Sequence, residues 1–108
     1  MSQLVKSGHD LHELLKVKDK AFVLFYASWC PFSIRFLPIF EQQSKAKEQN
    51  FIRIIIDHEE SLCEKYSVAV YPTVIFFEKG KASTRLDGIS GVGLDEKKLT
   101  DLISACRA

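Results

Sequence analysis

The feature that most constrains the fold is the uninterrupted apolar and aromatic run AFVLFYASW at residues 21–29. A continuous run of this kind is typical of a strand that is covered on both faces, at the centre of a sheet. A second such run, FIRIIID, follows at residues 51–57. The two runs predict an α/β fold that is built around a buried central sheet.

Helical spacing and turn residues set the order of the remaining elements. Strand and helix alternate in the first half, which implies parallel strands with right-handed crossovers, and a C-terminal antiparallel hairpin turns at Lys79-Gly80. Pro38 is expected to kink the second helix. A mixed sheet with helices on both faces is therefore predicted. The predicted strands are 4–5, 21–29, 51–57, 73–78 and 82–86, and the predicted helices are 8–17, 32–49, 58–67 and a last one capped by Asp95.

Length and charge exclude several classes of protein. The 108 residues fit one domain, 1–108, and the net charge of +1 gives no basic surface for nucleic acid or an acidic membrane. The polar N-terminal stretch lacks the apolar core of a secretory signal, and no run approaches the roughly 20 apolar residues of a membrane span. The three cysteines fit no disulfide framework, so a cytoplasmic location is expected. No metal site is expected, because His9 and His12 could share a helix face but lack a third ligand.

Cys30 stands where the first buried run gives way to a helix. Such a residue projects from the carboxyl edge of the sheet, where open α/β sheets place their sites. The free N–H groups and the positive end of the helix dipole stabilise a thiolate, and Pro31 suits the first helical turn. These features favour an exposed, nucleophilic Cys30. A buried cysteine that only packs is the competing interpretation.

Several motifs together resemble the thioredoxin family, in order and spacing, over nearly the whole chain. The segment FYASWCPFS at 25–33 is similar to that family's Trp-Cys-Gly-Pro-Cys site. The segment KYSVAVYPTVIFFEKG at 65–80 is similar to the one that carries the family's cis-proline, and the strand IIID and the final DG with its helix also match. The resemblance implies the thioredoxin fold, thiol–disulfide exchange as the activity and no cofactor.

The resemblance also implies roles for individual residues. Cys30 would be the nucleophile that attacks a disulfide sulfur, and Trp29 would shield its thiol and form one wall of a groove. Pro72 would be cis, which would expose the backbone of Tyr71 opposite Cys30 for pairing with an extended client segment. Client protein disulfides are the expected partners, with glutathione or a thioredoxin-type reductase as reductant. The chain is expected to be a monomer.

Departures from the family pattern surround the expected nucleophile. Ser33 replaces the resolving cysteine, and its hydroxyl can only donate a hydrogen bond to a Cys30 thiolate. Pro31 stands in place of the usual glycine, and Phe32 in place of the proline, where it would put an aromatic face beside the thiol. Leu24, six residues before Cys30, replaces the family's buried aspartate, whose task is proton transfer during resolution. A protein that does not resolve needs no such acid.

The leading hypothesis is a monothiol Cys-Pro-Phe-Ser enzyme, similar to protein disulfide oxidoreductases and isomerases, whose mixed disulfide at Cys30 is resolved by glutathione or another thiol. One alternative is a client-binding module without turnover, and another is an engineered Cys-to-Ser form of a dithiol reductase. A third is the glutathione-dependent iron–sulfur binding of monothiol glutaredoxins, whose Cys-Gly-Phe-Ser site is partly similar. Cys63 is expected to pack in the core, and Cys106 to be exposed and distant from Cys30.

Overall fold

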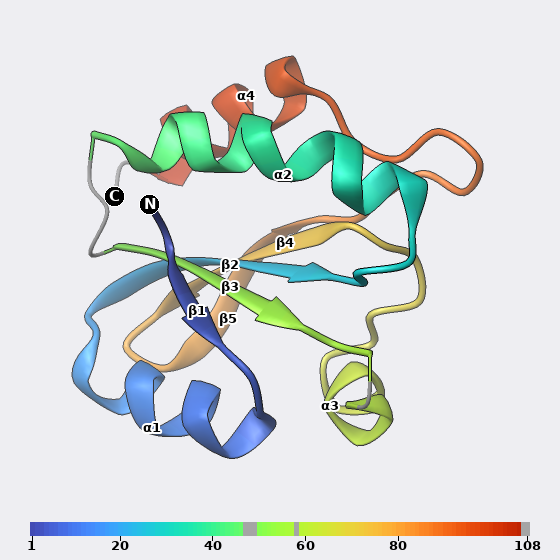
Figure 1. The fold of residues 1–108 in the computed structure, drawn as a ribbon. Coiled ribbons are helices and arrows are strands. Elements are labelled where there is room, and N and C mark those ends of the chain that lie inside the picture. Colours follow the sequence, from blue (N-terminus) through green and yellow to red (C-terminus); the bar gives the residue numbers. More distant parts are fainter. Residues whose placement is uncertain (47–49, 58, 107–108) are drawn as a thin grey trace.

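The computed structural model describes residues 1–46, 50–57 and 59–106. Within these ranges the elements alternate as the sequence predicts and form one sheet with helices on both faces (Figure 1). In chain order they are β1 (Gln3–Val5), α1 (Gly8–Val17), β2 (Lys20–Tyr26), α2 (Pro31–Ser44), β3 (Phe51–Ile55), α3 (Glu60–Lys65), β4 (Thr73–Glu78), β5 (Lys81–Leu86) and α4 (Glu96–Cys106).

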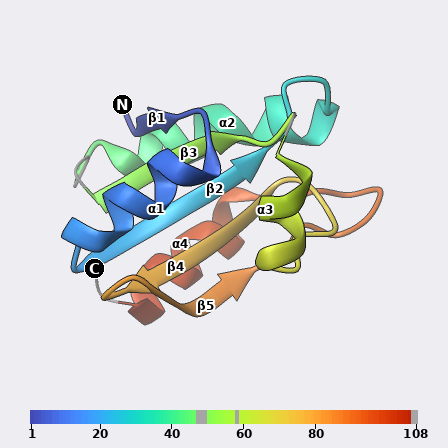
Figure 2. The ribbon, with the colours of Figure 1, turned by 90° about the horizontal axis from the view of Figure 1, so that it is seen from below.

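The sheet is mixed, as predicted, and its strand order is β1-β3-β2-β4-β5. β3 pairs in parallel with β1 and β2, whereas β4 pairs antiparallel with β2 and β5. β2 is therefore the central strand, which explains why its run is apolar on both faces. In Figure 1, α2 and α4 lie above the sheet, and α1 and α3 lie below it. Figure 2 shows α1 and α3 in front of the strands, seen from below.

Alternate side chains of the strands build two separate cores. One core lies on the side of α1 and α3 and includes Val23, Phe25 and Cys30. The other lies on the side of α2 and α4 and includes Phe22 and Leu24. Burial of each large apolar side chain contributes about 1.5–3 kcal/mol, so the two cores hold the helices firmly against the sheet. Five phenylalanines of the strands are buried in these cores: Phe22, Phe25, Phe51, Phe76 and Phe77.

Local capping and turn signals explain where several elements begin. The Ser7 side chain accepts a hydrogen bond from the Asp10 N–H at the start of α1, and Asp95 accepts one from the Lys98 N–H at the start of α4, as predicted. Lys79 and Gly80 turn the chain between β4 and β5 with φ of 53° and 81°, the left-handed conformation that a two-residue hairpin turn requires.

Some element bounds differ from the prediction. β2 ends at Tyr26, and residues 27–29 form a turn, so the apolar run continues beyond the strand. α2 continues through Pro38 and ends at Ser44, and the predicted helical residues 47–49 and 58 lie outside the described residues. In the part of the chain that the structure describes, no helix has the length and apolar character needed to cross a bilayer.

Candidate active site

Cys30 lies immediately before α2, at the junction with the turn that follows β2. Its backbone is extended, with φ −89° and ψ 119°, and its carbonyl oxygen accepts the first helical hydrogen bond from Ile34 N–H at 3.0 Å. The junction is the one predicted, but the expectation of an exposed side chain was wrong. Cys30 retains 7% of its accessible surface and packs in the core on the α1 and α3 side. Only a small part of the residue's surface is therefore accessible to a disulfide.

The backbone of Tyr71 lies opposite this thiol. The Tyr71–Pro72 peptide bond is cis, and the Tyr71 carbonyl oxygen accepts a hydrogen bond from Cys30 Sγ at 3.8 Å. The Thr73 hydroxyl donates to the Val70 carbonyl at 2.6 Å, which ties together the two ends of the segment around the cis bond. A Cβ at Gly88 would overlap the Pro72 carbonyl oxygen, so the following loop packs directly on this segment. Cys30 thus faces a fixed stretch of main chain.

Trp29 and Tyr71 form one wall of the site. Their rings meet edge to face, with centroids 6.1 Å apart and an interplanar angle of 86°. Trp29 is 65% exposed, whereas Tyr71 is half-buried and its hydroxyl donates to Cys63 Sγ at 3.7 Å. Burial, followed by this hydrogen bond, raises the pKa of Tyr71 to about 12. The phenol is therefore neutral at physiological pH and remains a donor.

Phe32, in the first turn of α2, contacts the loop before α4. Phe32 packs against the core cluster that contains Cys30, and the Arg35 guanidinium lies 5.3 Å from the Phe32 ring centroid. Arg35 also donates to the Val92 carbonyl at 2.5 Å. A Cβ at Gly93, where φ is 85°, would lie 2.9 Å from Phe32 Cβ, so the loop approaches this ring closely. No spacing pattern in the sequence pointed to Arg35.

The Ser33 side chain is directed differently from the expectation. It is fully buried, and its hydroxyl oxygen accepts a hydrogen bond from the Ala27 N–H at 3.3 Å. The hydroxyl thus helps to hold the turn after β2, a contact that the sequence did not predict. Leu24 is fully buried in the α2 and α4 core, so an apolar side chain stands where the family has its acid. Pro31 is exposed at the first position of α2.

The other cysteines differ in their surroundings. Cys63 is buried, as expected, but its contact with Tyr71 was not foreseen. Cys106 was expected to be exposed and is instead half-buried at the end of α4, where burial raises the pKa of its thiol. All three cysteines are free thiols.

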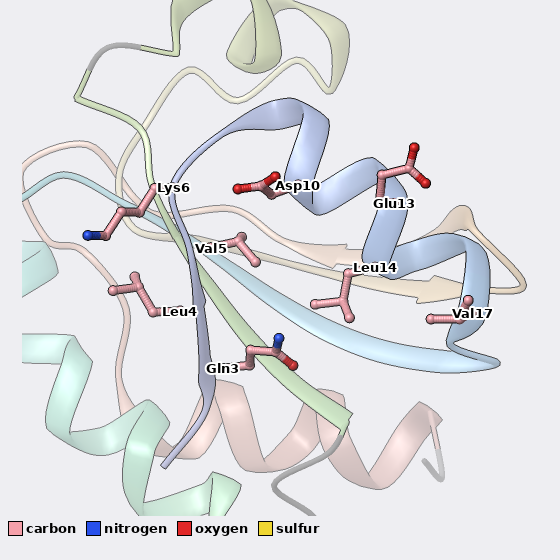
Figure 3. A pocket seen from close by; sticks show the side chains of 8 residues that line it. All are labelled: Gln3, Leu4, Val5, Lys6, Asp10, Glu13, Leu14 and Val17. Atoms are coloured by element: carbon pink, nitrogen blue, oxygen red, sulfur yellow. The ribbon is translucent and has the colours of Figure 1, made fainter.

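Other parts of the described chain offer less chemistry. Within residues 1–46, 50–57 and 59–106, no group of three His, Cys, Asp or Glu side chains is arranged to hold a metal ion. A hollow of about 500 Å³ lies between β1 and α1, and its lining includes Gln3, Leu14 and Val17 (Figure 3). No cysteine lines this hollow, so it is separate from the thiol chemistry.

The fold and the junction at Cys30 define a class: α/β proteins with a cysteine at a helix N-terminus that faces a cis-proline segment. The chain belongs to the thioredoxin family, whose model matches residues 3–105. It is 34% identical over 80 residues to thioredoxin of Mycoplasmoides gallisepticum, covering 73% of this chain and 80% of that protein. The X-ray structure of Fasciola hepatica thioredoxin has a TM-score of 0.81 and 27% identity, with 95% of this chain and 97% of that one covered.

A longer relative matches in one part only. Endoplasmic reticulum resident protein 44 of Homo sapiens is 32% identical over 84 residues, which is 70% of this chain and 21% of that protein. This chain therefore spans about a fifth of that relative. The chain is a thioredoxin-type redox protein, and thioredoxin-like proteins act on protein disulfides and are reduced by thiol partners. The single-cysteine chemistry at Cys30 goes beyond these similarities.

Proposed function

We propose that this protein catalyses thiol–disulfide exchange through Cys30 alone, and that an external thiol of the glutathione type completes each cycle. The observation that carries the proposal is the contrast between Cys30 and Ser33. Cys30 Sγ lies against the Tyr71 carbonyl, whereas the position of a resolving sulfur holds a buried hydroxyl that is bonded to the Ala27 amide. A hydroxyl in this position cannot attack a mixed disulfide.

The exchange proceeds in three balanced steps. The Cys30 thiolate attacks one sulfur of a client disulfide, so that a Cys30–client disulfide forms and the second client sulfur leaves as a thiolate. A glutathione thiolate then attacks Cys30 Sγ, which releases the client thiolate and leaves Cys30 joined to glutathione. A second glutathione attacks the glutathione sulfur, giving glutathione disulfide and free Cys30. The client disulfide gains two electrons, and two glutathione molecules supply them.

The residues around Cys30 select the substrate. The main chain of Tyr71, beside Pro72, offers hydrogen-bonding groups to an extended client segment, and such pairing gives affinity without strong sequence preference. Trp29, which precedes Cys30 in the chain, and Phe32, which packs against the same core cluster as Cys30, add aromatic surface. Pro31, exposed at the first turn of α2, lies at the rim. Clients with an extended, partly apolar stretch beside the disulfide are the best fit.

A second candidate is a client-binding module that forms a mixed disulfide and does not turn over. The 7% exposure of Cys30 favours this binding module. Once a client is bound to Cys30, a bulky thiol has limited access to Cys30 Sγ. The two candidates share the first step and differ in the second. A cytoplasmic location belongs to the proposal as well, since a reducing compartment supplies the second thiol. Recovery of the protein from an oxidising compartment in cell fractionation would contradict that location.

The test is a glutathione-coupled assay on a peptide–glutathione mixed disulfide, in a Cys106→Ser background that removes the half-buried third thiol. Turnover that rises with glutathione concentration and disappears in Cys30→Ser is expected. The matched control is Cys30→Ser without Cys106→Ser, which asks whether Cys106 supplies activity. Stoichiometric accumulation of a Cys30 mixed disulfide that glutathione does not release would overturn catalysis in favour of the binding module.

A further inference from the structure

Tyr71 connects three parts of the site. Its carbonyl oxygen accepts from Cys30 Sγ at 3.8 Å, its ring meets the Trp29 ring edge to face, and its hydroxyl donates to Cys63 Sγ at 3.7 Å. The carbonyl and the phenol oxygen are opposite ends of one residue. Cys30 and Cys63 therefore contact the same tyrosine from two sides.

Cys63 is poorly suited to exchange with clients. It lies in α3, is 8% exposed, and packs in the same core cluster as Cys30. Its sulfur accepts from the Tyr71 hydroxyl, and its backbone is held by hydrogen bonds from Cys63 N–H to the Glu59 carbonyl at 3.2 Å and from Val68 N–H to the Cys63 carbonyl at 2.8 Å. A sulfur fixed on a helix is a defined anchor for the phenol, although it is a weak acceptor.

We propose that Cys63 is a positioning residue for the chemistry at Cys30: by accepting the Tyr71 hydroxyl, it fixes the ring that supports Trp29 and the main chain that receives the client. The inference rests on the proposed function, because it concerns the Trp29 and Tyr71 surface beside which clients would reach Cys30. The buried side of the ring is held by Cys63, while Trp29 itself is largely exposed. Loss of this anchor leaves the Tyr71 ring held by packing alone, so the support of Trp29 is less well fixed.

The expected effect is modest and specific. The net free energy that one hydrogen bond contributes corresponds to a change of about two- to tenfold in an equilibrium constant, and a bond to sulfur, a weak acceptor, lies at the lower end. We expect Cys63→Ala to raise the KM for an extended peptide mixed disulfide by about that factor. The rate with a small disulfide that does not reach the Trp29 wall should change less. A purely structural role would lower stability and leave the ratio of the two rates unchanged.

The chain offers a clean spectroscopic probe and a matched control. Trp29 is its single tryptophan, so fluorescence anisotropy reports the mobility of this ring alone. Leu62, the neighbouring buried residue of α3, has its side chain beside Gly8 of α1, so Leu62→Ala disturbs the packing of α3 at a different contact. Cys63→Ser retains an oxygen acceptor for the Tyr71 hydroxyl, and Tyr71→Phe removes the donor while keeping the ring.

The experiment compares these variants, and the Tyr71→Phe/Cys63→Ala double variant, by Trp29 anisotropy and by KM for the peptide substrate. We expect Cys63→Ala and Tyr71→Phe to lower the anisotropy and raise KM alike, the double variant to add nothing further, and Cys63→Ser to restore both values. Additive effects, or equal effects of Leu62→Ala and Cys63→Ala, would overturn the inference. If wild type shows no glutathione-dependent turnover, the proposed function fails. The anisotropy of Trp29 and the rate of mixed-disulfide formation at Cys30 still decide whether Cys63 positions Tyr71.

Discussion

Replacement of Ser33 by cysteine tests the proposal that a missing sulfur limits this site. Ser33→Cys introduces a second thiol in the first turn of α2, three residues after Cys30. In the reduced variant the Ala27 N–H loses its oxygen acceptor, and sulfur replaces it only weakly. We expect a loss of about 1 kcal/mol in the free energy of unfolding, with Ser33→Ala at about 1–3 kcal/mol because the buried amide is then unpaired.

Oxidation of the Ser33→Cys variant should turn this loss in the free energy of unfolding into a gain. A disulfide that closes a loop of only a few residues stabilises by roughly 2 kcal/mol in the chain-entropy treatment. The oxidised Ser33→Cys variant should therefore be more stable than wild type by about 1 kcal/mol, which corresponds to about 4–8 °C in melting temperature. In the variant the sulfur at this position can also attack the mixed disulfide at Cys30 and release the client without glutathione.

Two assays check these expectations. Thermal melts of reduced and oxidised Ser33→Cys should bracket the wild-type value, and insulin reduction driven by dithiothreitol should be faster for the variant than for wild type. Ser33→Ala is the control, since it alters the same hydrogen bond and adds no sulfur. The reasoning is refuted if Ser33→Cys gains no insulin reduction, or if wild type already releases its client without any external thiol.

Three further changes probe the frame of the site. Gly88→Ala should lower the free energy of unfolding in urea by about 1–3 kcal/mol, because the new Cβ overlaps the Pro72 carbonyl oxygen. An unchanged urea midpoint would contradict this, because it would mean that the loop can move away without cost. Arg53→Met should cost about 1–3 kcal/mol, since it leaves the Glu41 carboxylate, 14% exposed, without its partner at 3.2 Å; Arg53→Met with Glu41→Gln should cost less. Burial raises the pKa of Tyr71 from 10.0 to about 12, so folding favours the neutral phenol. That stability is complete below pH 10 and is lost as pH rises to about 12. Wild type should therefore lose more melting temperature over this interval than Tyr71→Phe, and parallel curves would contradict the shift.

Local sequence signals were enough to predict the fold. The run at 21–29 marked the central strand because burial on both faces demands apolar residues at every position. Asp95 marked the start of the last helix because its side chain satisfies a free N–H of the first turn. Lys79-Gly80 marked the hairpin. Each signal depends on neighbours in the chain, so one sequence was sufficient to find it.

Side-chain directions in the site were not accessible in the same way. Ser33 bonds to Ala27, rather than to Cys30, because the turn after β2 brings a main-chain amide to its hydroxyl. The contact of Tyr71 with Cys63 depends on how α3 packs beside the cis-proline segment. The burial of Cys30 likewise depends on tertiary packing, because its neighbours in the core and the Tyr71 carbonyl come from distant parts of the chain. No spacing pattern encodes these distances.

The two edges of the sheet bear on how the protein behaves in concentrated solution. β1 spans only Gln3–Val5, and β5, at the opposite edge, is exposed from Lys81 to Arg85 and carries two positive charges, one at each of these residues. Short or charged edge strands are poor templates for pairing with other chains, and proteins use them against aggregation. If the main chain at Tyr71 pairs with clients, as we propose, any self-association through that same stretch would compete with client capture.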